Sequence, residues 1–173
     1  IPALLAGCTV VLKPAPDTPV TAAFMGELAL EAGFPAGVFN VVSSADPVMA
    51  GETLVTDPRV DVISFTGSTG VGKRIMEKGA ATLKRVFLEL GGKSANIILD
   101  DASDFAMSVM QSIVIFHAGQ GCAIPTRLFV PRSRYEEALK ALEMAYAGFA
   151  TKWGDFDDPT QVMGPVISAR QRD

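Results

Sequence analysis

The alternation of short β-branched runs with helix-length apolar patterns is the feature that most constrains this fold. The run at 8–13 ends at Pro14 and is typical of a buried strand. The pattern after it predicts a helix that Thr18 caps and Gly33 ends. Alternation of this kind indicates an α/β fold, with a parallel sheet and ligands bound at the carboxyl ends of its strands. The sequence predicts strands at 8–13, 38–42, 60–65, 85–90, 95–99 and 127–130, with helices at 19–32, 47–56, 69–79, from 101 or 103 towards 116, and from 133 onward.

Composition limits the classes of partner. The net charge is −4 and no basic stripe is present, which argues against nucleic acid and anionic membranes as partners. No apolar run reaches the roughly 18 residues that a membrane span needs. Cys8 and Cys122 cannot build a disulfide framework, one histidine gives no metal site, and no secretory leader is visible, so we expect a cytoplasmic protein without metal. The chain begins without Met and ends in a polar stretch, which we interpret as an internal piece of a longer polypeptide.

A glycine-rich turn after the third predicted strand has the features of a phosphate cradle. In residues 65–74, free amides at the start of a helix and the Ser68 hydroxyl would face an anion. Gly67 and Gly72-Lys73 also match most of a triphosphate-binding loop, but Arg74 stands where that loop needs a hydroxyl for magnesium. A turn that only tightens the joint between strand and helix is the structural alternative.

Glu89 and Cys122 are the candidate catalytic residues. A thiol can attack a carbonyl carbon, and a carboxylate can take a proton from water. Cys122 follows two glycines that leave its backbone open to close approach, whereas Cys8 lies in a strand pattern and is expected in the core. Glu89 lies in an alternating strand, where an inward orientation would desolvate it and suit it to general-base work. A plain core thiol at Cys122, and a pair of Cys122 with His117, stay open as alternatives.

Five segments, in order along the chain, resemble motifs of the NAD(P)-dependent aldehyde dehydrogenases. The resemblance covers nearly the whole chain. Residues 7–14 with Thr18-Pro19 are similar to the strand that leads to the family's ribose-binding lysine, 33–40 to its glycine-proline link, 65–69 to the turn under the pyrophosphate, 88–93 to the general-base motif, and 119–122 with Arg127 to the nucleophile motif.

The resemblance implies a division into two parts at Gly91-Gly92. Residues 1–91 would be the C-terminal half of an NAD(P)-binding domain with a parallel Rossmann-like sheet. Residues 92–173 would begin a second α/β domain, which carries the nucleophile. The implied cofactor is NAD, with NADP as the alternative. Lys13 would bind the adenosine ribose, and the pyrophosphate would be held by Gly67, Ser68, Val71 and Gly72.

The same resemblance implies the chemistry. Cys122 would attack a small-molecule aldehyde, and its own backbone amide would supply part of the oxyanion hole. Hydride would pass to NAD(P), and Glu89 would activate the water that hydrolyses the thioester. The whole enzyme is implied to be a homodimer or homotetramer, and this piece alone is expected to be inactive. Two alternatives stay open: a CoA-acylating aldehyde dehydrogenase, against which Glu89 argues, and a non-catalytic nucleotide-binding fragment.

The chain departs from the family pattern at three places. Pro16 stands where the family often has a glutamate that binds the ribose hydroxyls, so one barrier to a 2′-phosphate is absent. Residues 43–46 replace a glycine-rich turn near the adenine. His117 stands where the family often has asparagine, which leaves the shape of the substrate pocket open.

Overall fold

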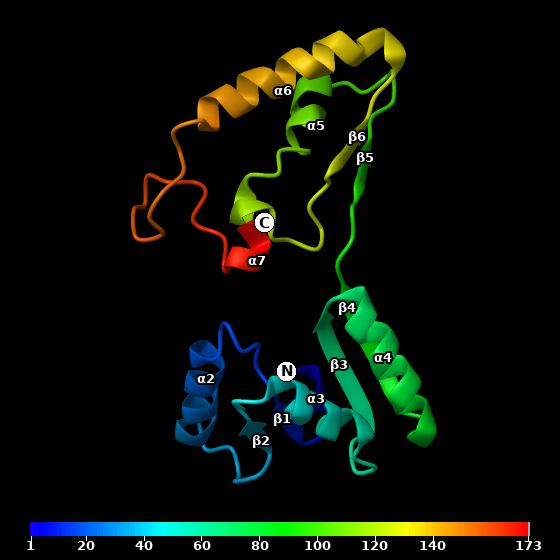
Figure 1. Cartoon of the computed structure of the whole chain (residues 1–173), viewed down its shortest axis with the longest axis vertical. Helices are drawn as coiled ribbons and strands as arrows, with labels where there is room; N and C mark the ends of the chain where they lie inside the picture. Colours follow the sequence, from blue (N-terminus) through cyan, green and yellow to red (C-terminus); the bar gives the residue numbers. More distant parts are fainter. Residues whose placement is uncertain (173) are drawn as a thin grey trace. The chain divides into compact units, whose positions relative to one another are not determined.

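The computed structural model describes residues 1–172, apart from the side chain of Phe116. The chain divides into two compact units, one formed by residues 1–65 with 73–87, the other by residues 66–72 with the chain from Leu88 onward. Both units contain a pair of parallel strands with helices next to it (Figure 1). This confirms the predicted α/β class with parallel strands.

The first unit is built on two parallel strands. It begins with α1 (Pro2–Leu5) and β1 (Val10–Leu12), which pairs with β2 (Phe39–Val41). Parallel neighbours need a crossover connection, and α2 (Val20–Glu31) supplies it. A Cβ on Gly26 would lie 3.1 Å from Val41 Cγ2, so this glycine lets α2 approach β2 closely.

The next elements carry the predicted glycine turn. α3 (Pro47–Thr56) follows β2, and Asp46 caps it by accepting hydrogen bonds from two amides of its first turn. β3 (Val62–Gly67) and α4 (Thr69–Gly79) then lead through a 3₁₀ turn at Ala80–Thr82 to β4 (Arg85–Leu90), which pairs with β3. The division between the two units falls inside β3, α4 and β4, so each of these elements contributes residues to both units.

The second unit has its own parallel pair and its own core. β5 (Ala95–Ile97) pairs with β6 (Arg127–Phe129), and α5 (Phe105–Met110) and α6 (Tyr135–Phe149) pack together beside them. Short 3₁₀ turns lie at Phe116–Gly119 and Arg132–Arg134, and α7 (Ala169–Arg172) ends the described chain. The buried core consists of Ile98, Phe105, Val109 and Ala138.

Two predicted helix boundaries are wrong. α2 begins at Val20 with no side-chain cap, so Thr18 does not cap it. α5 ends at Met110 instead of running towards residue 116, and Asp104 caps it rather than residue 101 or 103. After Met110 the backbone closes shorter turns, with Ile113 N donating to Met110 O at 3.1 Å. The β-branched run at 113–115 has a low helix propensity, which accounts for the early end.

Cys8 was expected in a buried strand, and that expectation is also wrong. The strand spans only Val10–Leu12, and Cys8 precedes it with an exposed side chain. The amide of Cys8 donates to Ala3 O at 3.0 Å, which ties it to the turn that closes α1.

The domain boundary expected at Gly91-Gly92 stays a prediction. Among the residues described, no helix has both the length and the apolar character needed to cross a bilayer.

Candidate active site and cofactor site

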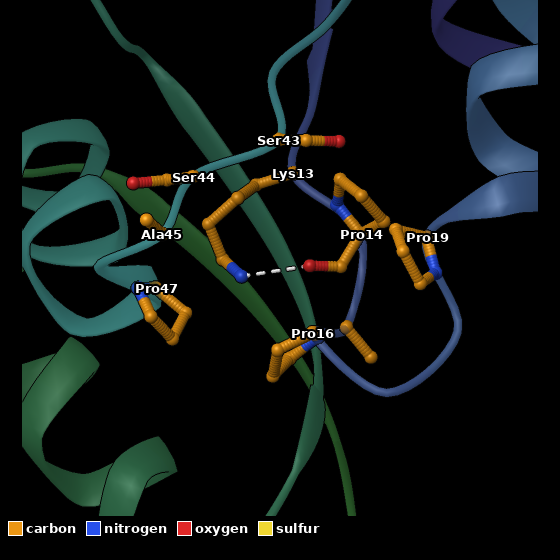
Figure 2. Close-up of a pocket in the computed structure, with 9 residues that line it drawn as sticks. Lys13, Pro14, Pro16, Pro19, Ser43, Ser44, Ala45 and Pro47 are labelled. Atoms are coloured by element: carbon orange, nitrogen blue, oxygen red, sulfur yellow. Dashed lines mark hydrogen bonds between the residues drawn. The ribbon is translucent and has the colours of Figure 1, made fainter.

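A cavity of about 240 Å³ lies where β1 and β2 end. Residues 13–16 follow β1 and residues 43–47 follow β2, so both sides of the cavity come from the carboxyl ends of parallel strands. This is the edge at which open parallel sheets bind ligands. Figure 2 shows Lys13 between the two loops, with Pro16 and Ser44 on opposite sides of it.

Lys13 is the only charged residue among the described residues that line this cavity. Its side chain is half-buried, and Nζ donates to Pro14 O at 2.9 Å (Figure 2). An ammonium has three N–H donors, so donors remain for hydroxyl or phosphate oxygens of a ligand. The other polar side chains of the lining are the hydroxyls of Ser43 and Ser44, and none of the described lining residues carries a carboxylate. The site is therefore suited to a neutral or anionic group.

The glycine turn between β3 and α4 places Ser68 at the start of α4. Ser68 Oγ accepts a hydrogen bond from Val71 N at 3.4 Å, which is the position of a helix cap. The first amides of a helix have no partner within it, and a Cβ added at Gly70 would meet nothing within 4 Å. Gly67, Ser68 and Val71 are exposed. The turn is therefore exposed to an approaching anion, and of its amides Val71 N and Gly72 N already donate to Ser68.

Gly72 has a different environment from the rest of the turn. It is buried, its amide donates to Ser68 O at 2.9 Å, and an added Cβ would lie 2.8 Å from Leu90 Cδ2. The absence of a side chain at Gly72 lets α4 pack against β4. Lys13 belongs to the first unit and the turn at 66–72 to the second, so the predicted cofactor residues are divided between the two.

Arg74 forms an ion pair that argues against the triphosphate-loop alternative. Its Nη2 lies 3.0 Å from Glu52 Oε2 and its Nε donates to the other oxygen, so the two side chains form a bidentate pair between α4 and α3. The hydrogen bond from Arg74 holds the pKa of Glu52 below its ordinary value. Position 74 thus ties two helices together and has no hydroxyl for a magnesium ion.

Glu89 lies on β4 with its side chain exposed. Exposure alternates along this strand, so Arg85, Phe87 and Glu89 share the exposed face. The inward orientation considered for Glu89 is therefore absent, and its carboxylate is open to water in the described chain. Glu89 and Cys122 belong to the same unit, and no hydrogen bond joins them in the part of the chain that the structure describes.

Cys122 is exposed in the connection between the 3₁₀ turn at Phe116–Gly119 and β6. Three successive residues before it have left-handed backbone: His117 and Ala118 with φ of 53°, and Gly119 with φ of 76°. Such geometry is costly outside glycine, and strained residues cluster at active sites and ligand clamps. The side chain of His117 is exposed in the same loop, five residues before Cys122.

Gln120 lies within the segment at 119–122 that resembles the nucleophile motif, and the sequence alone predicts no role for its side chain. Gln120 bonds both to the loop itself and to the segment before α7, 47 residues further along. A contact of that separation leaves no local signal in a single sequence. In the described residues, no group of three or more His, Cys, Asp or Glu side chains could hold a metal ion.

Comparison with known proteins identifies the family. The family model described as "Aldehyde dehydrogenase family" matches residues 1–173 of this chain. Mouse retinal dehydrogenase 2 is 47% identical over 98% of this chain and 33% of its own length. Betaine aldehyde dehydrogenase of Staphylococcus aureus, solved in complex with NAD+, is 40% identical with a TM-score of 0.90 over 99% of this chain and 34% of that one. An E. coli NADP-dependent enzyme is 42% identical with a TM-score of 0.87 over 98% and 35%.

These matches confirm the predicted family and its α/β fold, because similarity holds in sequence and in structure across nearly the whole chain. The chain spans about a third of the length of the curated relatives it matches. The cavity after β1 and β2, the open turn before α4 and the exposed thiol of Cys122 all lie within the matched region. The chain belongs to the aldehyde dehydrogenase family.

Proposed function

We propose that this chain is part of an NAD(P)-dependent aldehyde dehydrogenase that oxidises a small aldehyde to its carboxylic acid. The observation that carries the proposal is the family match over residues 1–173, which includes both Glu89 and Cys122. The exposed thiol of Cys122, next to a left-handed loop, supports it as the nucleophile. The exposed carboxylate of Glu89 can reach water, which a base in thioester hydrolysis requires.

The reaction follows from these two side chains. The Cys122 thiolate attacks the aldehyde carbon to form a thiohemiacetal, and the amide of Cys122 donates to the oxyanion. A bound dinucleotide would supply the hydride acceptor, so that loss of hydride from this carbon would leave a thioester on Cys122. Glu89 then takes a proton from water, the hydroxide attacks the thioester carbon, and the acid departs as the Cys122 thiolate re-forms.

The predicted cofactor residues are assigned to separate parts of a dinucleotide. Lys13 would donate to the adenosine ribose in the cavity after β1 and β2, which its remaining N–H donors support. Gly67, Ser68 and Val71 would hold the pyrophosphate at the start of α4, supported by the open space at Gly70. Gly72 would act through packing against Leu90 rather than by direct contact. NAD is the proposed cofactor, with NADP as the alternative.

The whole protein is proposed to work in the cytoplasm as a homodimer or homotetramer. Both cysteines are free, which suits a reducing compartment. The two-stranded sheets leave large apolar side chains exposed, such as Ile97 at 68% and Phe87 at 62%, and such surface is typically covered by further protein.

Pre-steady-state kinetics of the full-length protein tests the assignment. Cys122→Ser should abolish the burst of NAD(P)H, because the thioester cannot form. Glu89→Gln should keep the burst and lower the steady-state rate by about 10²–10⁴-fold, because only hydrolysis needs the base. Glu143→Gln, an exposed carboxylate on α6, is the matched control.

The results also separate the proposal from its rivals. A Cys122→Ser variant with normal activity would exclude the mechanism. Faster thioester transfer to CoA than to water, with no effect of Glu89→Gln, would indicate the CoA-acylating class instead.

A further inference from the structure

The loop that carries Cys122 has an unfavourable backbone and must be held from outside. His117 and Ala118 both lie in the left-handed region, with ψ of 28° and 35°, although neither is a glycine. Residues in such conformations persist only where the surrounding structure over-determines them. The contacts that hold this loop therefore control where the Cys122 thiol lies.

Two hydrogen bonds join the side chain of Gln120 to groups far apart in the sequence. Its Nε2 donates to His117 O at 3.0 Å, and its Oε1 accepts from Ile167 N at 3.0 Å. The backbone amide of Gln120 also donates to His117 O at 3.0 Å, so the carbonyl of the first left-handed residue is bonded twice. Figure 1 shows the segment that leads into α7 lying beside this turn.

A second tie holds the other end of the same loop. Val114 N donates to the hydroxyl of Tyr146 at 3.3 Å, which attaches the start of the loop to α6. The loop is thus fixed at Val114 by α6 and at Gln120 by the segment before α7. Cys122 lies two residues beyond the second of these ties.

We infer that Gln120 is a positioning residue for the nucleophile, acting by clamping the Cys122 loop to the backbone at Ile167. This rests on the proposed function of Cys122. A carboxamide of this length supplies the donor for His117 O and the acceptor for Ile167 N together. Glutamate keeps only the acceptor, and methionine keeps the length while losing both hydrogen bonds.

Steady-state kinetics of the full-length protein tests the clamp. Gln120→Met should lower kcat about 10-fold to 100-fold, because small displacements of a reacting group are costly, while KM for the aldehyde changes less than about threefold. Gln120→Glu should fall between wild type and Gln120→Met. Gln111→Ala, an exposed glutamine at the end of α5, should match wild type.

Substitutions at Ile167, whose backbone amide donates to Gln120, give an independent test of the clamp. Because the donor is the backbone amide of Ile167, Ile167→Ala should be nearly silent, whereas Ile167→Pro removes the amide hydrogen and should lower kcat. Combining Gln120→Met with Ile167→Pro should cost little more than either change alone, since both break the same bond. Thermal midpoints within about 4 °C of wild type would show that the variants fold.

Distinct results would overturn the inference. Normal kcat in Gln120→Met, a change in KM alone, or additive effects of Gln120→Met and Ile167→Pro would each exclude the clamp. If Gln120→Met does not fold, wild-type kinetics in Gln120→Glu would exclude it equally. Failure of the proposed function would appear separately, as normal turnover in Cys122→Ser.

Discussion

Cofactor choice should depend on Pro16, which lines the cavity beside Lys13. The described lining residues carry one ammonium, two serine hydroxyls and no carboxylate, so none of them repels a 2′-phosphate on the adenosine ribose. We therefore expect the full-length protein to discriminate weakly between NAD and NADP. Introducing a carboxylate by Pro16→Glu should shift the preference towards NAD, by repelling the phosphate and by accepting hydrogen bonds from a free ribose.

The size of the cavity sets the magnitude of the expected shift in cofactor preference. A volume of about 240 Å³ is roughly 8 Å across, so a carboxylate on its rim would repel a phosphate dianion by about 1 kcal/mol in a water-like medium and about 4 kcal/mol at an effective dielectric constant near 20. The lower figure corresponds to about a fivefold change in relative affinity. The Debye length is about 8 Å at physiological ionic strength, so the shift should shrink as salt is added.

The assay is the ratio of kcat/KM for NAD to that for NADP, measured at low and high salt. Pro16→Gln is the matched control, because it removes the ring of proline and adds a side chain of the same size without charge. Thr18→Glu adds the same charge on an exposed residue that does not line the cavity, and should have the smaller effect. An unchanged ratio in Pro16→Glu, or an equal shift in Pro16→Gln, would refute the electrostatic reasoning.

Two further predictions concern the helices beside the proposed cofactor site. Asp46→Ala should lower the free energy of unfolding by about 1 kcal/mol and weaken dinucleotide binding, since it removes the cap of α3 beside the cavity, whereas Asp46→Asn should retain both; urea titration with calorimetric binding would check this. Because Arg74 lowers the pKa of Glu52 from 4.5, their ion pair should stabilise above that pH and be lost as pH falls through the lowered value. The difference in thermal midpoint between wild type and Glu52→Gln should therefore fade as the pH falls below 4.5, and a constant difference would contradict the assignment.

The elements predicted best are those in which local signals agree. Pro47–Thr56 and Arg85–Leu90 were predicted with the bounds that the structure gives. In α3, proline stands in the first turn after a capping Asp46. In β4, exposed and half-buried side chains alternate along the strand, as the sequence pattern requires.

The wrong predictions concern segments whose residues are compatible with more than one backbone conformation. The apolar run after Met110 is compatible with a longer helix by hydrophobicity alone, but its β-branched members favour the tighter turns that the structure adopts. Cys8 belongs to an apolar run, yet the amide is taken by the turn that closes α1, and the strand begins only at Val10. Gln120 lay within a recognised motif, but its bond to Ile167 depends on how segments distant in sequence meet.

The glycine turn before α4 shows why the structural and functional interpretations of one motif are not exclusive. Gly72 has no room for a side chain because Leu90 lies against it, so its glycine is explained by packing alone. Gly70, two residues earlier, has open space where a side chain would be, so packing does not explain it. Close packing of α4 on β4 fixes the direction in which the first amides of the helix point, and the open position keeps an approach to them clear. A phosphate cradle needs both properties, and in this turn they are supplied by different glycines.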